Sequence, residues 1–211
     1  MKTKKLIVFT CLLGIGYSCV KHEVVPPPSN LVQLNTAFTG TINGTDVELT
    51  DDVEGFNGED SQDQIILAPP ALSSAKYYCD MTSNLISTSV KVGIGSNTWD
   101  GSALTKPSIN QFNDFTEALK NASVAYSDNA VDGFVVNYTD AFGNLWISNE
   151  NSVNTQSVDF TKITTQSDDT GDYALFEVDF SCHVYPTVSL DPLEIDSLRI
   201  DNASLSGWFK R

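Results

Sequence analysis

The sequence predicts an all-β protein, an antiparallel β-sandwich of about 9–10 strands with one amphipathic helix. Three observations favour this class. Apolar and polar side chains alternate over many short segments after residue 36, which is the period of half-buried strands. Turn residues separate these segments, and only one segment has helical spacing. An open or closed β-barrel is the alternative, because the pattern does not reveal the strand order.

The first two strands are predicted to form a hairpin. Apolar residues, among them Phe38 and Ile42, alternate with polar ones before Asn43-Gly44. Val47 and Leu49 resume this alternation after the turn. Asn-Gly favours a type I′ turn, in which both central residues need a positive φ. Further strands are expected at residues 64–68, 75–81 and 86–94.

One amphipathic helix is predicted over residues 108–122. Its apolar residues recur at spacings of three and four, as on one helix face, namely Ile109, Phe112, Phe115, Leu119 and Ala122. Ser108 stands three residues before Gln111, which is the arrangement of a capping box at a helix start. The rest of the chain returns to strands, expected at residues 132–139, 145–148, 158–164, 173–185, 195–200 and 203–209.

The first residues have the order of an export signal. Lys2, Lys4 and Lys5 precede an apolar run over residues 6–15, and small residues then lead to Cys19. The run is shorter than the roughly 20 apolar residues that a membrane-spanning helix needs. This segment resembles bacterial lipoprotein signal peptides, which implies cleavage before Cys19 and acylation of that cysteine. The alternative is an ordinary signal peptide with an incidental cysteine.

The expected organisation is therefore a signal peptide at residues 1–18, a lipid-anchored tether at 19–30 and one domain at 31–211. The tether contains three successive prolines, which favour an extended, semi-rigid spacer. Its partner would be a membrane, and the expected location is the cell envelope, attached to the outer membrane.

The charge of the chain excludes one class of partner. Its formal net charge is −15, and loss of residues 1–18 removes three lysines and no acid, which leaves −18. Nucleic-acid binding depends on Lys and Arg that neutralise phosphates. We therefore expect no nucleic-acid partner.

Two cysteines, Cys79 and Cys182, remain in the predicted domain, each on the apolar face of a strand. An exported compartment permits a disulfide between them. The alternative is two separate buried thiols that pack as small apolar side chains.

A resemblance emerges in the second half of the chain. Residues 133–148, with Asp140 and Gly143 at a turn and Trp146 on the return strand, are followed by residues 156–160 and 180–182. Together these segments resemble uncharacterised small all-β lipoproteins of the Bacteroidota cell envelope. The resemblance implies an envelope lipoprotein and brings no catalytic residue with it.

The sequence has few residues in a pattern that would suit catalysis, and we predict no catalytic residue. His22 falls in the tether, and His183 falls on the polar face of a strand, where a catalytic triad would need a serine within reach. Catalysis by paired carboxylates, as in a small secreted hydrolase, is the alternative because 27 acidic residues offer many pairs. No cofactor is predicted except structural calcium, for which Asp168, Asp169 and Asp172 and the acidic segment 51–63 are weak candidates.

Two tryptophans suggest a ligand site. Trp99 stands beside Asp100 in a polar segment, and Trp208 is out of phase with its apolar neighbours, so both are predicted to be partly exposed. Exposed aromatic rings beside carboxylates can stack on and hydrogen-bond a sugar. The predicted function is a non-enzymatic module that binds a glycan or an envelope protein. A structural or assembly accessory is a further alternative.

Overall fold

Ten antiparallel strands follow one another along the chain in the computed structural model, which describes residues 31–127, 132–150, 152, 154–187 and 197–211. Their bounds are β1 Ala37–Ile42, β2 Thr45–Thr50, β3 Phe56–Ile65, β4 Ser73–Ser83, β5 Ser89–Trp99, β6 Gly133–Thr139, β7 Leu145–Ser148, β8 Ser157–Asp168, β9 Gly171–Pro186 and β10 Leu198–Lys210. The predicted signal peptide, Cys19, His22 and the tether lie outside the described residues.

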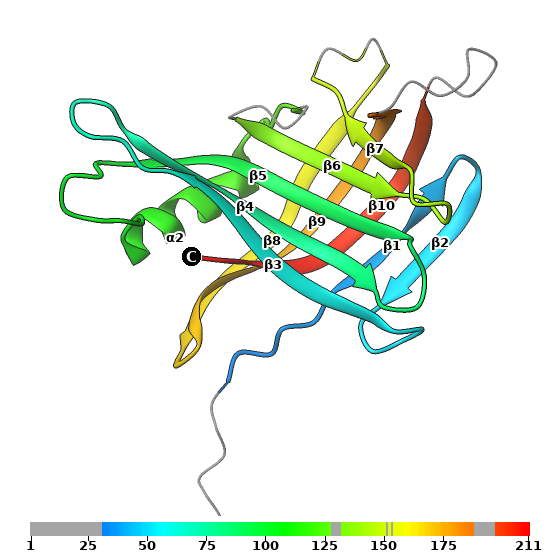
Figure 1. Cartoon of the computed structure of the whole chain (residues 1–211), viewed down its shortest axis with the longest axis horizontal. Coiled ribbons are helices and arrows are strands. Elements are labelled where there is room, and N and C mark those ends of the chain that lie inside the picture. The colour runs from blue at the N-terminus through cyan, green and yellow to red at the C-terminus, as the bar shows by residue number, and fades with distance from the viewer. Residues whose placement is uncertain (1–30, 128–131, 151, 153, 188–196) are drawn as a thin grey trace, which may run out of the picture. The chain divides into compact units, whose positions relative to one another are not determined.

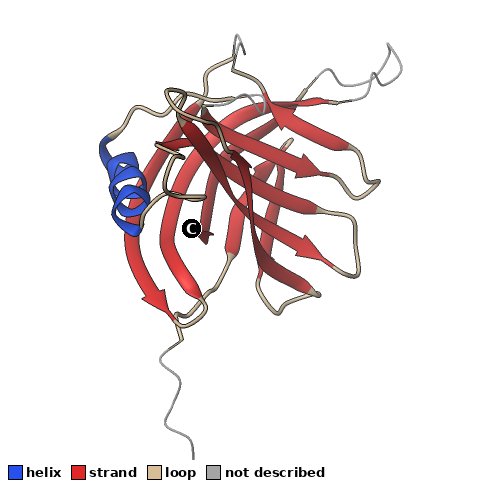
Figure 2. Ribbon diagram, turned by 60° about the vertical axis from the view of Figure 1, so that its left-hand side comes forward, coloured by secondary structure: helices blue, strands red, loops and turns tan. Residues whose placement is uncertain are grey.

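All ten strands belong to one sheet. Its order is β2-β1-β10-β9-β7-β6-β5-β4-β3, and β8 pairs with β9 beside this path (Figure 1). The all-β class, the number of strands and the amphipathic helix are confirmed. The sheet curls, so that its inner face closes over one core, and the described domain is a half-barrel rather than two separately hydrogen-bonded sheets (Figure 2).

Strand β9 is the branch point of the sheet. One of its edges pairs with β10 along nearly its whole length. The other edge pairs first with β8, over residues 171–181, and then with β7, over residues 184–186. Tyr126 ties this branch together, because its hydroxyl donates to the main-chain oxygens of Ser157 on β8 and Ser181 on β9.

The Asn43-Gly44 hairpin is confirmed. Strands β1 and β2 pair from Ala37 and Thr50 up to Ile42 and Thr45. Asn43 has a φ of 49° and Gly44 a φ of 82°, as a type I′ turn requires.

The predicted helix is also present, as α2 (Ile109–Ala118) followed by a 3₁₀ turn, η1 (Leu119–Asn121). Ser108 caps it as expected, since its hydroxyl accepts from the Gln111 amide and the Gln111 side chain accepts from the Ser108 amide. Phe112 and Leu119 are buried, whereas Ile109 is exposed. The prediction that Ile109 belongs to the buried stripe is wrong, because the buried side chains of α2 begin one turn later.

Aromatic rings fill the inside of the curled sheet. The rings of Phe176 on β9 and Phe209 on β10 are stacked with centroids 4.3 Å apart. Phe134 on β6 makes edge contacts with Phe160 and Phe180. Aromatic contacts of this kind add to the free energy gained from burying the rings. The inner face is therefore a packed core.

Two strands differ from the prediction. β3 begins at Phe56, whereas the strand was predicted at residues 64–68, so most of the acidic segment 51–63 is a strand, which pairs with β4 from Phe56 to Ile65. β10 is one strand with a bulge between Ile200 and Ala203, where two separate strands were expected. Both differences arise from pairing with a neighbouring strand, which local periodicity does not show.

Candidate binding surfaces

The two tryptophans predicted to contact a ligand are buried. Trp99 ends β5 and is 2% exposed, and its indole N–H donates to the Leu104 main-chain oxygen at 3.0 Å. Trp208 is 5% exposed. A Cβ added at Gly58 on β3 would lie 2.6 Å from the Trp208 ring, so β3 covers this ring. The prediction of partly exposed rings at Trp99 and Trp208 is wrong.

Asp100 is used to hold a turn. Its side chain accepts from the main-chain amide of Ser102 at 2.8 Å. This hydrogen bond lowers the pKa of Asp100 below its usual value. Without an exposed tryptophan beside it, Asp100 does not form the predicted sugar site.

Cys79 and Cys182 are both buried and both free, so of the two alternatives left open, a disulfide or two separate buried thiols, the structure has the second. Burial raises the pKa of each thiol to about 12. The two cysteines have different surroundings, since Cys79 packs near Gly207 on β10 while Cys182 lies near Tyr126.

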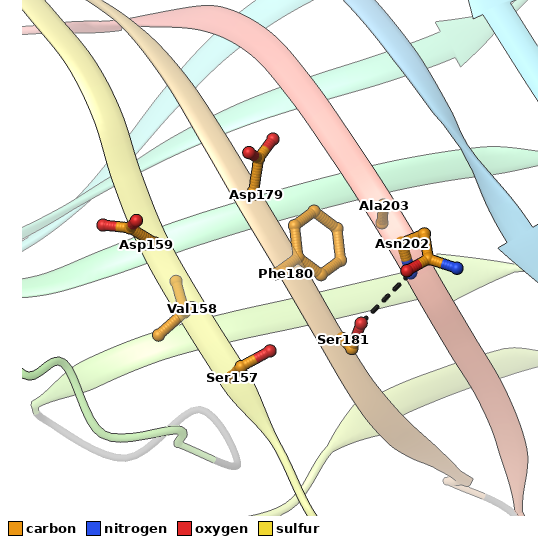
Figure 3. Close-up of a pocket in the computed structure, with 8 residues that line it drawn as sticks. All are labelled: Ser157, Val158, Asp159, Asp179, Phe180, Ser181, Asn202 and Ala203. Atoms are coloured by element: carbon orange, nitrogen blue, oxygen red, sulfur yellow. Dashed lines mark hydrogen bonds between the residues drawn. The ribbon is translucent and has the colours of Figure 1, made fainter.

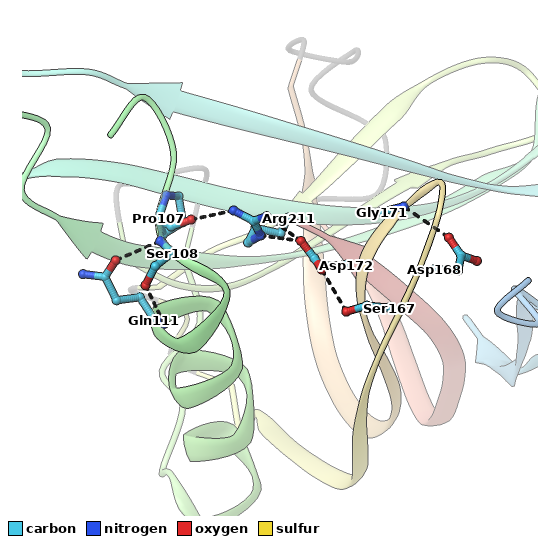
Figure 4. Close-up of polar contacts among 8 residues, drawn as sticks. All are labelled: Pro107, Ser108, Gln111, Ser167, Asp168, Gly171, Asp172 and Arg211. Atoms are coloured by element: carbon cyan, nitrogen blue, oxygen red, sulfur yellow. Dashed lines mark hydrogen bonds and ion pairs between the residues drawn. The ribbon is translucent and has the colours of Figure 1, made fainter. Parts of the chain in front are cut away.

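Two of the calcium candidates at the β8–β9 turn, Asp168 and Asp172, already have partners (Figure 4). One oxygen of Asp168 accepts from Thr170 and from the amide of Gly171. Asp172 forms an ion pair with Arg211, whose guanidinium also donates to the Pro107 main-chain oxygen. These contacts fasten the C-terminus between the β8–β9 turn and the start of α2.

Among the described residues, which include the acidic segment 51–63 and Asp169, there is no group of three or more His, Cys, Asp or Glu side chains placed to hold a metal ion. The carboxylates of Asp168 and Asp172 thus contribute to the turn and to the C-terminal attachment. The calcium prediction gains no support from this geometry.

His183 lies on the outer face of β9, as the alternation predicted, and its Nδ1 is 3.3 Å from the Ser197 hydroxyl. A triad would also need a carboxylate on the imidazole. The neighbouring Asp201 is paired with Arg199 at 2.7 Å, and no carboxylate bonds to His183 within the part of the chain that the structure describes. The described residues therefore do not complete a catalytic triad here.

A polar depression of about 410 Å³ lies on the outer face of β8, β9 and β10 (Figure 3). Its polar side chains are Ser157, Asp159, Asp179, Ser181 and Asn202. Asp159 and Asp179 are directly opposite each other across the two strands, where like charges repel. Both are exposed, so solvent screens that repulsion.

Asn202 belongs to this depression and to two neighbouring ones. One contains His183, Arg199 and Asp201, and the other contains Thr41 and Asp46. The pairings of β10 with β9 and with β1 both shift register here because β10 has an extra residue, and Asn202 has a φ of 46°. This bulge interrupts the regular pleat and gives this face its uneven surface.

An apolar surface lies at the tip of the β3–β4 hairpin. All eight residues from Ile65 to Leu72 are apolar and all are exposed. Exposed Leu104 and Ile109 come from the segment after β5 and from the start of α2. This segment contacts the hairpin, since a Cβ added at Gly101 would lie 2.8 Å from the Leu67 main-chain oxygen. We call Ile65, Ile66, Leu67, Leu72, Leu104 and Ile109 the apolar end.

The apolar end lies on the α2 side of the domain in Figure 1. Further exposed apolar side chains, Val53, Leu85, Ile86 and Phe142, are spread over three other loops. Sequence reasoning missed the apolar end because residues 64–68 alternate poorly and were predicted to be a strand. The signal was available: an uninterrupted apolar run that contains Pro69-Pro70 cannot be a central strand.

Comparisons of the chain with family models, with curated proteins and with solved structures found no match. The function must therefore be inferred from the surfaces themselves. Within the described residues, no helix is both long enough and apolar enough to cross a membrane.

Proposed function

We propose that the chain is a lipid-anchored protein of the cell envelope that binds another protein and has no catalytic activity. The observation that carries this proposal is the apolar end. Contiguous apolar patches of this kind on soluble domains mark interaction sites. Water contact with so many aliphatic side chains is unfavourable, and a partner that covers them would remove this cost.

Burial of Trp99 and Trp208 favours a protein over a glycan, the two kinds of ligand that the sequence predicted. A glycan site would use an exposed aromatic plane, and neither tryptophan supplies one. A protein partner instead needs apolar surface at the centre of the interface, with polar groups at its rim. The apolar end supplies the apolar surface, and Asp63 and Lys106, its neighbours in the chain, are polar groups for the rim.

Binding of a glycan at the polar depression is the second candidate. Three depressions meet at Asn202 and offer hydroxyl, amide and carboxylate groups to a hydroxyl-rich ligand. We expect weak binding, with a Kd of about 1 mM, because the polar groups are solvated before binding. Loss of binding to envelope polysaccharide in Asn202→Ala would support it, and unchanged binding would contradict it.

A carboxylate-dependent hydrolase has less support. A carboxylic acid that protonates a leaving group needs a raised pKa, which apolar surroundings provide. Asp159 and Asp179 are instead exposed on a shallow face.

Site-specific photo-crosslinking tests the main proposal. A photoreactive amino acid at Leu67 in the full chain, expressed in its own envelope, should give one predominant adduct with a protein. The matched control is the same amino acid at Thr164, an exposed residue of β8. Equal adducts from both positions, or adducts of Leu67 with lipid alone, would overturn the proposal.

The anchor has its own test. Cys19→Ser should abolish incorporation of radioactive palmitate and release the chain from the membrane fraction, because two or more acyl chains are needed for stable attachment. Unchanged labelling would show that the cysteine is not the acylated residue. The crosslinking result does not depend on this outcome.

A further inference from the structure

The open edge of β3 stands directly beside the apolar end. β3 is the last strand in the sheet order and pairs only with β4 among the described strands. The start of β3 is covered, since Gly58 approaches Thr36 and Trp208. From Glu59 to Ile65 every residue is exposed. Seven residues span roughly 23 Å, which is the length of an ordinary strand.

The charge of this edge selects what can pair with it. Glu59, Asp60 and Asp63 are the only charged residues from 59 to 65, and all are acidic. Asp63 accepts a hydrogen bond from the Tyr78 hydroxyl, while the carboxylates of Glu59 and Asp60 accept none from the described part of the chain. A second copy of this chain, with its net charge of −15, would place acid against acid. Like charges directly opposite each other destabilise a strand pair.

We propose that the edge of β3 from Glu59 to Ile65 accepts an extended basic segment of a partner protein as an added strand. Main-chain hydrogen bonds to an open edge supply affinity in this mode, and side chains supply specificity. Lys or Arg side chains of the segment would face Glu59 and Asp63, which share one face of β3. The continuation of the segment would cover Ile66 and Leu67. This inference rests on the proposed function and names the chemistry of the partner.

Acidic side chains on an edge strand also prevent unspecific pairing. Here that protection stops at Ile65, where the exposed apolar run begins. If prevention of unspecific pairing were the only role of this edge, polar residues would be expected at the tip as well. An acidic edge that continues into an apolar tip instead fits a segment with basic residues followed by apolar ones.

A peptide of alternating Lys and Val, roughly nine residues long to match the edge, is a suitable probe. Its binding to the full chain in detergent can be measured by fluorescence anisotropy. Three comparison peptides separate the contributions: one with Glu in place of Lys, one with every main-chain amide N-methylated, and one with two additional leucines at each end, so that either strand direction places leucines beside Ile66 and Leu67. We expect binding of the first peptide, none of the Glu or N-methylated peptides, and tighter binding of the leucine-extended one.

The variant Glu59→Lys with Asp63→Lys should lower the affinity for the Lys/Val peptide about tenfold. The matched control is Asp159→Lys with Asp179→Lys, which makes the same change of charge on β8 and β9 and should alter the affinity less than about twofold, because neither strand neighbours β3 in the sheet. Unchanged melting temperatures would show that both variants are folded.

Four outcomes would overturn the inference. Equal binding of the N-methylated peptide would show attraction between charges without strand addition. A larger loss of affinity in the control variant would place the binding site for the basic peptide on β8 and β9. A dimer of the full chain that is broken by Glu59→Lys with Asp63→Lys would assign the edge to a second copy. A protein adduct at Leu67 combined with failure of all peptides would leave the proposed function standing and reject strand addition alone.

Discussion

Strands β9 and β3 each contain three acidic residues, yet they have opposite surroundings. β9 has a neighbour on each edge, and its side chains alternate between core and solvent. β3 has a neighbour on one edge, and from Glu59 onward both of its faces are exposed. The position of a strand in the sheet and the alternation of apolar residues along it together determine how much of it is buried. The central strand gives the domain its stability, and the edge strand is free for an interaction.

The largest effect that would test this contrast is the loss of a core ring on β9. Phe176 is buried between Phe209 and Phe160. Phe176→Ala should lower the free energy of unfolding by about 3–5 kcal/mol, because it removes the ring and leaves a cavity. Urea unfolding followed by circular dichroism would measure it. A loss below about 1 kcal/mol would show that the core of β9 is less tightly packed than the ring contacts indicate.

A smaller effect is expected where β10 crosses β4. A Cβ at Gly207 would lie 2.4 Å from the Sγ atom of Cys79, so Gly207→Ala should cost about 1–3 kcal/mol in unfolding free energy through overpacking. Adding Cys79→Ala removes the sulfur and should restore part of the loss. If Gly207→Ala costs the same with and without Cys79→Ala, the two strands do not approach as closely as described.

Acid should weaken the β8–β9 turn in a defined range. Hydrogen bonds from Thr170 and from the Val32 amide lower the pKa of Asp168 from 3.8 to about 2. A carboxyl whose pKa is lower in the folded state stabilises the fold above its unfolded pKa and loses this contribution as the pH falls through the folded value. The stabilisation is thus complete above about pH 4 and disappears toward pH 2.

Asp168→Asn should therefore differ most from the parent at neutral pH, and the difference should shrink between about pH 4 and pH 2. Urea unfolding at a series of pH values would show this. Thr170→Val, which removes the side-chain donor, should flatten the profile in the same direction. A difference that stays constant over the whole range would contradict the assignment.

The smallest effect is expected at the tip of β3. Leu67→Ser and Leu72→Ser should each change the unfolding free energy by less than about 0.5 kcal/mol, because both side chains are already exposed. The same substitutions should lower the binding of a fluorescent apolar dye to the native protein. Destabilisation by more than about 1 kcal/mol would mean that the tip is packed, and the contrast with β9 would fail.

Features that depend on a few neighbouring residues were predictable. The Asn43-Gly44 turn and the capping box of Ser108 and Gln111 rest on local φ angles and local hydrogen bonds, and both are found as predicted. The same holds for the alternation of β9, which places Cys182 inward and His183 outward. Periods of two and of 3.6 residues reveal which side of an element is apolar.

What covers each face of a strand or helix could be known only from the tertiary structure. The sequence by itself determined an all-β domain, one capped helix and the acidic character of the chain. Burial of Trp99 and Trp208, the separation of Cys79 from Cys182, and the open edge of β3 were decided by which distant strands meet. The physical reason is that periodicity fixes the direction in which a side chain points, whereas burial depends on what lies there. That is determined by long-range pairing, as when Gly58 of β3 comes to cover Trp208.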